Sequence, residues 1–318
     1  MNVLSQFWYP VKWSKEVTDK PVSVKLLDQP LVLWRAGDKV SAFYDLCLHR
    51  GAALSLGWVD SDKLVCGYHG WNYAADGSCV KIPSLPPYRE IPAKARAKSY
   101  HVQERHGLIW VCLDEPRQDI PDFPAEIDDP TFVWGPYNSE GQWRANAARM
   151  IENLADFSHF PWVHNGILGD PAQPESPPIE LSEVKGGFQY EIDTPVNRLR
   201  ASSASKQLYT VILPFMVIIQ RRQPGGDERH TNIYLCTPVA NNETKFYRLA
   251  GRNYRDAKTD EQLNAQHRKI FEQDKAIVES QRPWELPLDL AEELHLRGPH
   301  TPAIEYRRRL KQMGIEWL

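Results

Sequence analysis

The chain has 318 residues, which at roughly 100–200 residues per domain corresponds to two domains or one large one. Its 38 Lys and Arg residues against 41 Asp and Glu residues leave a net charge of −3, so the basic excess of proteins that bind nucleic acids or anionic membranes is missing. The longest apolar run, Val211–Ile219, is far shorter than the ~20 residues of a membrane-spanning helix.

Five cysteines are an odd number in a large chain, which argues against a disulfide framework. The N-terminal residues lack the basic and apolar regions of a secretory signal. We therefore expect a cytoplasmic protein with no membrane partner and no nucleic-acid partner.

The first 115 residues predict a small all-β domain. Turn residues occur at Ala36-Gly37-Asp38 and at Ala75-Asp76-Gly77. The expected strands are Trp8–Trp13, Val22–Leu27, Leu31–Arg35, Val40–Tyr44, Leu64–Cys66 and Leu108–Leu113. Repeated prolines between Asp114 and Pro136 indicate a linker, so we place one domain at residues 1–115 and a second at 116–318.

The second domain mixes helices and strands, which makes the whole chain α+β. A helix is expected near 146–160, stopped by Pro161, and a longer one at about 260–282, begun by the capping-box pair Thr259 and Gln262 and ended by Pro283. The tail predicts a loop and a short helix whose Arg307-Arg308-Arg309-Lys311 run is exposed. The expected strands are 188–194, 207–213, 215–222, 230–237 and 244–250.

A first metal-type cluster has the spacing C-x-H-x16-C-x2-H, formed by Cys47, His49, Cys66 and His69. Each half follows a predicted strand and supplies one thiolate and one imidazole. This arrangement suits a two-iron cluster in which both cysteines bind one iron and both histidines bind the other, which is the ligand set of a Rieske centre. A zinc site and a chance composition are the alternatives, although zinc modules more often repeat C-x2–4-C.

The remaining cysteines are interpreted as small apolar residues in or near strands. They are Cys79, Cys112 and Cys236.

A second cluster has the spacing Asp156-x2-His159-x4-His164. On a helix, Asp156 and His159 share one face, and Asn153 lies one turn earlier on the same face. We expect Pro161 to break this helix, so that His164 turns back toward His159. Asp156 also suits the carboxylate that orients a metal-binding histidine.

A carboxylate partner for these histidines is predicted in the 260–282 helix. Asp274 lies in the middle of an apolar stripe that includes Ile270 and Phe271 before it and Ile277 and Val278 after it, while Glu272, Gln273 and Lys275 are assigned to the outer side. A buried ionised carboxylate must be paired or bound to a metal.

Two interpretations of Asp274 follow. It forms a 2-His-1-carboxylate iron site with His159 and His164, or it forms a buried salt bridge with an arginine. Glu279 and Glu152 are the reserve candidates for the third ligand.

Together these stretches resemble the α-subunits of Rieske non-heme iron oxygenases. The resemblance extends from FWYPV near the N-terminus to EQDKAIVESQRP in the last long helix, and it is carried by CLHRGAALSLG, CGYHGWNYAADGSCVKIPS and ENLADFSHFPWVH. It is closest to the short monooxygenase branch, which includes vanillate and dicamba demethylases, toluenesulfonate methyl-monooxygenase and saxitoxin-tailoring hydroxylases.

The resemblance implies an antiparallel-β Rieske domain followed by a helix-grip-type catalytic domain, a curved antiparallel sheet closed by the long C-terminal helix. It implies that Cys47, His49, Cys66 and His69 bind a [2Fe–2S] cluster. His159, His164 and Asp274 would bind a mononuclear Fe(II). Asp156 would connect His159 to His69 of a neighbouring subunit in a homotrimer, and Asn153 would lie near the iron.

The expected function is to hydroxylate or oxidatively demethylate a small aromatic or alkaloid-like substrate with O2; the sequence does not separate these two reactions. Because no nucleotide-binding G-x-G-x-x-G follows a strand, a separate NAD(P)H-dependent reductase, with or without a ferredoxin, must supply electrons. A Rieske electron carrier fused to a non-catalytic ligand-binding domain and a zinc-stabilised binding protein are the alternatives.

Two groups of basic residues have open interpretations. The first group is interpreted either as a docking site for the reductase or as a solvated strand face, and it consists of Arg89, Lys94, Arg96, Lys98 and Arg105. The other binds a substrate carboxylate or sulfonate, or faces solvent: Arg198, Arg200, Arg221 and His230. The substrate pocket itself is expected between the 260–282 helix and strands at 196–222 and 230–238.

Overall fold

The computed structural model describes residues 2–135, 138–194, 205–222, 226–256, 258–315 and 317. The chain divides into two compact units, one extending to Ile120 and the other beginning at Pro121. This division lies inside the proline-containing stretch between Asp114 and Pro136. None of the helices in the described ranges is long and apolar enough to cross a membrane.

The first unit consists of two antiparallel sheets. The six-stranded sheet has the order β1-β10-β9-β4-β3-β2, and the four-stranded sheet has the order β5-β6-β7-β8. The strands are β1 Tyr9–Trp13, β2 Val22–Leu26, β3 Gln29–Ala36, β4 Lys39–Tyr44, β5 Trp58–Asp60, β6 Lys63–Val65, β7 Asn72–Tyr73, β8 Cys79–Lys81, β9 Ser99–Arg105 and β10 Leu108–Cys112. All six predicted strands of this unit are present.

The unpredicted strands of this unit are short or polar. β9 is mostly polar and exposed, and it obtains its hydrogen bonds from the fully buried β10 beside it. A buried cluster that includes Trp34, Phe43 and Tyr73 packs around Cys47 and Cys66. This core fixes the loops that follow β4 and β6.

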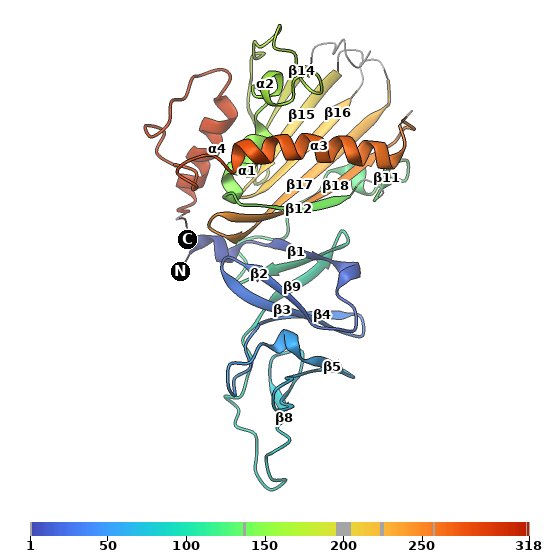
Figure 1. The fold of residues 1–318 in the computed structure, drawn as a ribbon, viewed down its shortest axis with the longest axis vertical. Helices are drawn as coiled ribbons and strands as arrows, with labels where there is room; N and C mark the ends of the chain where they lie inside the picture. The colour runs from blue at the N-terminus through green and yellow to red at the C-terminus, as the bar shows by residue number, and fades with distance from the viewer. Residues whose placement is uncertain are drawn as a thin grey trace. The chain divides into compact units, whose positions relative to one another are not determined.

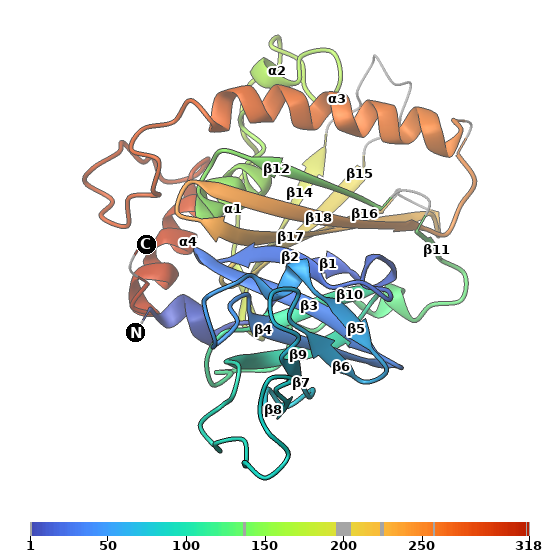
Figure 2. The ribbon, with the colours of Figure 1, turned by 60° about the horizontal axis from the view of Figure 1, so that its bottom comes forward.

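The second unit contains an eight-stranded antiparallel sheet with the order β11-β18-β17-β16-β15-β14-β13, and β12 pairs with β18. The strands are β11 Val133–Trp134, β12 Ser139–Trp143, β13 Ser182–Val184, β14 Gly187–Thr194, β15 Ser205–Ile212, β16 Met216–Arg222, β17 Arg229–Ala240 and β18 Glu243–Arg252. The helices are α1 Ala147–Ala155, α2 Phe160–Val163, α3 Asp260–Val278 and α4 Thr301–Gln312. α3 lies across one face of the sheet (Figure 1), and Figure 2 shows the sheet nearly edge-on beneath it. The fold is therefore α+β, with the predicted sheet closed by a long helix.

α3 begins at the predicted capping box but ends at Val278, before the predicted boundary at Pro283. Its buried stripe is narrower than expected. Phe271, Asp274 and Val278 are buried, whereas Ile277 is 51% exposed.

The helix predicted at 146–160 is wrong in its C-terminal half. α1 ends at Ala155, because Asp156 adopts an extended conformation and its carboxylate accepts hydrogen bonds from the backbone N–H groups of Ser158 and His159. Such side-chain bonds compete with continued helix. Pro161 does not stop the helix but lies in the first turn of α2, where a missing N–H costs nothing.

Arg307 on α4 contradicts the expected exposed basic face. It is only 2% exposed, and it forms ion pairs of 2.6 Å with Glu152 on α1 and 2.5 Å with Glu293. The neighbouring Arg308 is exposed.

Candidate metal centres

Two loops of the first unit have matching backbone geometry around Cys47 and Cys66. In each loop the cysteine N–H donates to the carbonyl five residues later, at 2.7 Å in the first loop and 2.8 Å in the second. A glycine four residues after the cysteine donates back to the cysteine carbonyl at 3.0 Å in both loops. These glycines, Gly51 and Gly70, have φ of 69° and 66°, a region that disfavours other residues. The two loops therefore present their side chains in equivalent ways.

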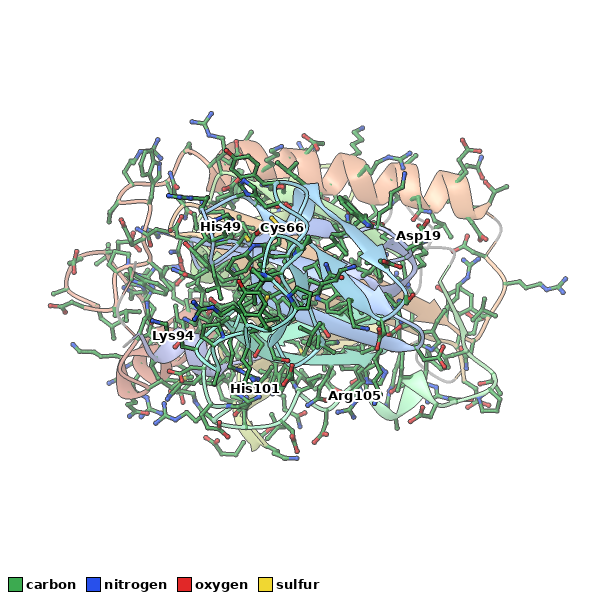
Figure 3. The ribbon with its side chains drawn as sticks, turned by 90° about the horizontal axis from the view of Figure 1, so that it is seen from below. Asp19, His49, Cys66, Lys94, His101 and Arg105 are labelled. Carbon is green, nitrogen blue, oxygen red and sulfur yellow. The ribbon has the colours of Figure 1, made fainter. Side chains whose placement is uncertain are left out.

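The side chains of these loops converge as a mixed sulfur and nitrogen set. Cys47 and Cys66 are each 1% exposed, and their thiols lie within hydrogen-bonding reach of each other. The rings of His49 and His69 are 4.5 Å apart, and the labels of His49 and Cys66 lie next to each other in Figure 3. His49 Nδ1 is buried and has no hydrogen-bond partner among the described residues. Two inner thiols and two outer imidazoles fit a cluster with one thiolate-bound and one imidazole-bound iron.

Neighbouring side chains hold this set in place. The Tyr73 hydroxyl lies 3.1 Å from Cys47 Sγ, and the ring of Trp71 stacks on His49 with centroids 4.9 Å apart. Asp45 accepts a 2.7 Å hydrogen bond from the Ser55 N–H. Burial raises the pKa of the Cys47 thiol, while the hydrogen bond from Tyr73 lowers it. A bound metal ion is what stabilises a thiolate in such surroundings.

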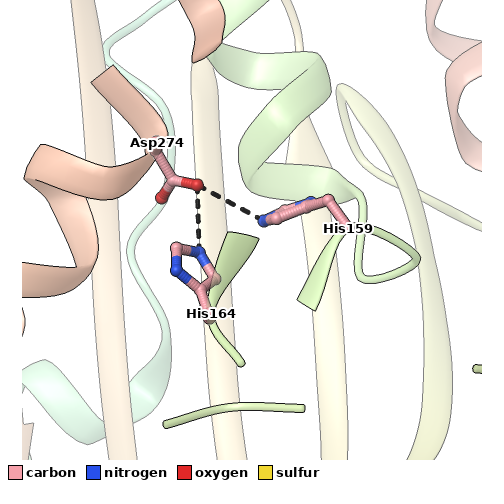
Figure 4. Close-up of side chains that lie close together, drawn as sticks. All are labelled: His159, His164 and Asp274. Atoms are coloured by element: carbon pink, nitrogen blue, oxygen red, sulfur yellow. Dashed lines mark ion pairs between the residues drawn. The ribbon is translucent and has the colours of Figure 1, made fainter. Parts of the chain in front are cut away.

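The second centre combines side chains from α3 and from the segment around α2. His164 Nε2 lies 3.0 Å and His159 Nε2 lies 3.5 Å from Asp274 Oδ1 (Figure 4). One donor atom from each residue lies within 4.8 Å of the others. Asp274 is 5% exposed and His164 is 1% exposed. Two imidazole nitrogens and a carboxylate grouped in this way suit a divalent iron that keeps other coordination positions open.

The other ring nitrogen of each histidine is also engaged. His159 Nδ1 lies 2.7 Å from Asp156 Oδ2, and His164 Nδ1 lies 3.0 Å from Gln273 Oε1. Both contacts direct Nε2 toward Asp274, as expected for metal-binding histidines. The assignment of Gln273 to the outer side of the helix was wrong. The apolar pattern of α3 carries no signal for an amide that turns inward.

Burial opposes ionisation of Asp156, but hydrogen bonds from His159 and Ser158 outweigh it and keep the pKa of this carboxyl below its usual value. Asp156 is therefore an ionised carboxylate, and it accepts a hydrogen bond from the Nδ1–H group of His159. Burial also opposes protonation of His164, yet its contact with Asp274 raises the pKa of this imidazole.

The reserve carboxylates point elsewhere. Glu152 binds Arg307, and Glu279 accepts a 2.7 Å hydrogen bond from the Arg144 N–H. Asn153 lines the cavity that also contains the three-residue group.

A cavity of about 440 Å³ lies between α3 and the sheet and includes the candidate iron ligands in its wall. Its volume is within the range of small-molecule sites. The predicted residues Arg221 and His230 line it, whereas Arg198 and Arg200 lie outside the described residues. Asn232 and Tyr234 on β17 also line it, within the predicted segment 230–238. The sequence analysis missed the residues that β18 and α3 contribute, among them Arg248, Arg252 and His267. For Arg248 a signal was present, because this charge interrupts the apolar run FYRLA.

The basic residues proposed for reductase docking are all exposed. Lys94 and Arg105 are clearly separated in Figure 3, and Arg96 forms a 2.9 Å ion pair with Asp76. The choice between reductase docking and a solvated strand face stays a prediction.

Two kinds of metal-binding group define a class of protein. One unit has a pair of loops with two cysteines and two histidines, and the other unit has a group of two histidines and one carboxylate. The class is that of iron-dependent oxygenases that carry their own one-electron store. Comparison with known proteins gives the family.

Residues 7–100 match the Rieske [2Fe-2S] domain, and residues 143–316 match the vanillate O-demethylase oxygenase C-terminal domain. The chain is 33% identical to the methylxanthine N1-demethylase of Pseudomonas putida over 98% of this chain and 89% of the relative. It is 28% identical to the dicamba O-demethylase oxygenase component of Stenotrophomonas maltophilia, over 88% of each chain. The structure of the Pseudomonas putida enzyme with caffeine superimposes with a TM-score of 0.89, covering 97% of this chain and 90% of that one at 32% identity.

The chain therefore belongs to the Rieske non-heme iron oxygenases, as an oxygenase α-subunit of the demethylase and monooxygenase branch. Its cofactors are a Rieske [2Fe–2S] cluster and a mononuclear iron, and its reaction uses O2 and electrons from a separate reductase. Because the match covers both domains of oxygenases, the alternative of an electron carrier fused to a non-catalytic domain is not favoured.

Proposed function

We propose that this oxygenase removes a methyl group from a small planar substrate held in the cavity between α3 and the eight-stranded sheet. His159, His164 and Asp274 are the proposed iron ligands. The observation that most directly supports this proposal is that their donor atoms lie within 4.8 Å of one another in the wall of this cavity. Demethylation is preferred to simple hydroxylation because relatives over most of the chain are named as demethylases of methylxanthines and dicamba.

The iron supplies O2 activation, and the [2Fe–2S] cluster supplies electrons that originate in NAD(P)H. One oxygen atom enters a methyl C–H bond, and the resulting hemiaminal or hemiacetal breaks its C–N or C–O bond to release formaldehyde. The other oxygen atom is reduced to water by two electrons and two protons. The hydride of NAD(P)H accounts for both electrons and one proton, and the medium supplies the second proton. The amine or hydroxyl of the product keeps the hemiaminal or hemiacetal proton.

The protein side chains position this reaction. Asp156 and Gln273 hold the two imidazoles from behind, so that the ligand atoms are fixed before substrate enters. Tyr234 and Phe271 stack with ring centroids 5.6 Å apart and give the cavity a flat apolar side for a planar ring.

We further propose a homotrimer in which Asp156 carries the electron from His69 of a neighbouring subunit to His159. The partial exposure of the Asp156 side chain, at 26%, supports a role at a subunit contact. Light scattering tests the trimer. None of the five cysteines forms a disulfide, which supports work in a reducing compartment, the cytoplasm.

The function is tested by supplying the iron-loaded protein with NADH, a ferredoxin-type reductase and a panel of methylxanthines and aromatic methyl ethers. We expect formaldehyde and demethylated product in equal amounts for at least one member. A hydroxylated product that keeps its methyl group, without formaldehyde, would replace demethylation by hydroxylation. Asp274→Ala is the inactive control, and it separates oxygenase turnover from chemical oxidation by the reductase.

A further inference from the structure

The carbonyl group of Ala155, the last residue of α1, has a side-chain partner from the sheet. In a continuing helix this carbonyl would accept the N–H of His159, four residues later. In the structure the His159 N–H donates instead to Asp156 Oδ2 at 3.0 Å. The Ala155 carbonyl accepts a hydrogen bond from the hydroxyl of Tyr190 on β14. The tyrosine hydroxyl therefore replaces a backbone donor at the end of this helix.

This end of α1 lacks the usual groups that satisfy the last carbonyls of a helix. The residue after Ala155 is Asp156, and its φ of −97° and ψ of 144° are extended, unlike the left-handed angles of a glycine cap. No basic residue lies in the last turn of α1. Ala155 is buried, and a buried carbonyl without a donor is costly. The hydroxyl of Tyr190 therefore favours the end of α1 at this residue.

The sheet fixes the position of Tyr190. Its buried ring stacks on that of Tyr209, the directly opposite residue on β15, with 5.1 Å between centroids and 7° between planes. Burial, the neighbouring Tyr209 and the carboxylate of Asp156 raise the pKa of Tyr190, so the phenol keeps the proton that it donates. A strand thus holds a hydrogen-bond donor against the end of α1.

The bond to Ala155 has a consequence for His159. Asp156 Oδ2 accepts the backbone N–H of His159 and also lies 2.7 Å from His159 Nδ1. One carboxylate oxygen therefore holds both the backbone and the ring of a proposed iron ligand. Without the tyrosine hydroxyl, the Ala155 carbonyl would compete with Asp156 for the His159 N–H, because continued helix would satisfy it.

We propose that Tyr190 is a positioning residue for the iron site: its hydroxyl occupies the Ala155 carbonyl and thereby leaves the His159 N–H to Asp156. The hydroxyl contacts the end of α1, so it acts on the site through Asp156 and His159. The inference rests on the proposed function for the part of Asp156 in electron delivery, whereas the position of His159 is measured without turnover.

The test uses Tyr190→Phe, which keeps the stacked ring and removes only the hydroxyl. Tyr306→Phe is the matched control, because this buried tyrosine of the same unit also donates its hydroxyl to a backbone carbonyl, that of Pro214 at 2.9 Å. A third protein carries p-aminophenylalanine at position 190. Its weaker N–H donor at the same place on the ring carries the test if Tyr190→Phe does not fold.

Two properties of the loaded protein are measured. The EPR spectrum of the nitric oxide complex of the ferrous site reports the geometry of the iron ligands and needs no substrate. The rate at which O2 reoxidises a pre-reduced cluster reports electron delivery. It is measured with the methylxanthine or aromatic methyl ether that gives the most formaldehyde.

We expect Tyr190→Phe to change the rhombic splitting of the nitrosyl signal and to slow cluster reoxidation about tenfold, at the lower end of the effect of outer contacts on a metal site. The p-aminophenylalanine protein should lie between Tyr190→Phe and wild type, and Tyr306→Phe should match wild type. In an Asp156→Asn background, Tyr190→Phe should slow reoxidation no further, because it acts through that carboxylate.

A nitrosyl signal that is unchanged in both proteins altered at position 190, or that changes equally in Tyr306→Phe, overturns the positioning role. A changed nitrosyl signal with a normal reoxidation rate supports the positioning of His159 by Tyr190 and contradicts the electron path through Asp156. The two inferences therefore fail in different ways.

Discussion

Asp274 is an ionisable side chain that is 5% exposed, and the two imidazole nitrogens that face its Oδ1 explain why it is tolerated there. A buried carboxylate is costly unless a cation or a metal ion compensates its charge. The contacts that offset the charge of Asp274 also matter for the reaction, because Asp274 and the two histidines form the proposed iron site.

Replacing Asp274 by Ala is expected to remove the mononuclear iron, about one iron atom per chain, and to leave the visible absorption of the Rieske cluster unchanged. Iron analysis of purified protein, corrected for acid-labile sulfide, measures this loss. Glu279→Ala is the control, since Glu279 binds a backbone N–H away from the site. Full iron content in Asp274→Ala would place another carboxylate in the ligand set.

Gln273 orients His164 from behind, so Gln273→Leu is expected to weaken Fe(II) binding roughly 10–100-fold while the helix remains intact. Competition with a chelator of known affinity measures the change. The adjacent Glu272 is exposed, and Glu272→Ala should bind iron as the native protein does. If both variants behave alike, the Gln273 contact does not position the ligand.

Asp156→Asn is expected to retain both metal centres and to lose turnover by about 100-fold or more, because the carboxylate that holds His159 Nδ1 becomes a neutral amide. The rate at which O2 and substrate reoxidise a pre-reduced cluster isolates the electron-transfer step. Ser158→Ala removes a neighbouring hydrogen bond to the same carboxylate and should change this rate little. A normal rate in Asp156→Asn would remove Asp156 from the electron path.

At the residue scale, the sequence predicted groups whose chemistry contrasts with their surroundings. Asp274 interrupts an apolar stripe, and the cysteine and histidine spacing is uncommon. Gln273 was assigned to the wrong side of α3, because a neutral amide contrasts little with either face of a helix. Asp156 and His159 were paired correctly but for the wrong reason, since a turn rather than a helix brings them together.

At the scale of elements, α1 and α4 are joined by buried charges. Arg307 binds Glu152 on α1 and Glu293 in the preceding loop, while Arg149 on α1 binds the same Glu293 at 2.9 Å. Both arginines are 2% exposed. α1 directly precedes the segment that holds His159 and His164, so this network supports the position of the iron site.

Arg307→Met should lower the free energy of unfolding by about 3 kcal/mol, because it leaves a partly buried glutamate pair without its main cation. Thermal or urea unfolding measures the change, and Arg308→Met on the exposed side is the control. An effect no larger than that of Arg308→Met would show that the network contributes little.

The effect of Arg307→Met should also depend on pH. Burial opposes ionisation of Glu293, but its bonds to Arg149 and Arg307 outweigh burial and lower its pKa in the folded protein. A lowered folded pKa stabilises the fold above the ordinary pKa of glutamate, and this contribution is lost as the pH falls through the lowered value. The difference between wild type and Arg307→Met should therefore shrink on acidification.

Most long helices and strands were predictable because the pattern of apolar residues in their sequence matches the side chains that are buried in the structure. The five predicted strands of the second sheet and the capping box of α3 are present. β7 and β11, of two residues each, were missed because so short a segment has no periodicity. Arg307 was misassigned because a run of basic residues does not indicate which one contacts acidic residues distant in sequence.

At the scale of the whole molecule, the chain carries an electron store and an oxygen-activating iron. The ligand set of the store makes its reduction potential a diagnostic property. Two imidazoles in place of two thiolates raise the potential to roughly −150 to +300 mV, compared with about −400 mV for an all-thiolate plant-type cluster.

The most direct test of the account is an EPR experiment on anaerobically purified protein treated with dithionite and then with nitric oxide. We predict two signals: that of a reduced Rieske cluster, and that of a high-spin ferrous nitrosyl complex at the mononuclear site. Asp274→Ala should keep the first signal and lose the second. Fully iron-loaded protein that shows no reduced-cluster signal, or a nitrosyl signal that persists in Asp274→Ala, would contradict the account.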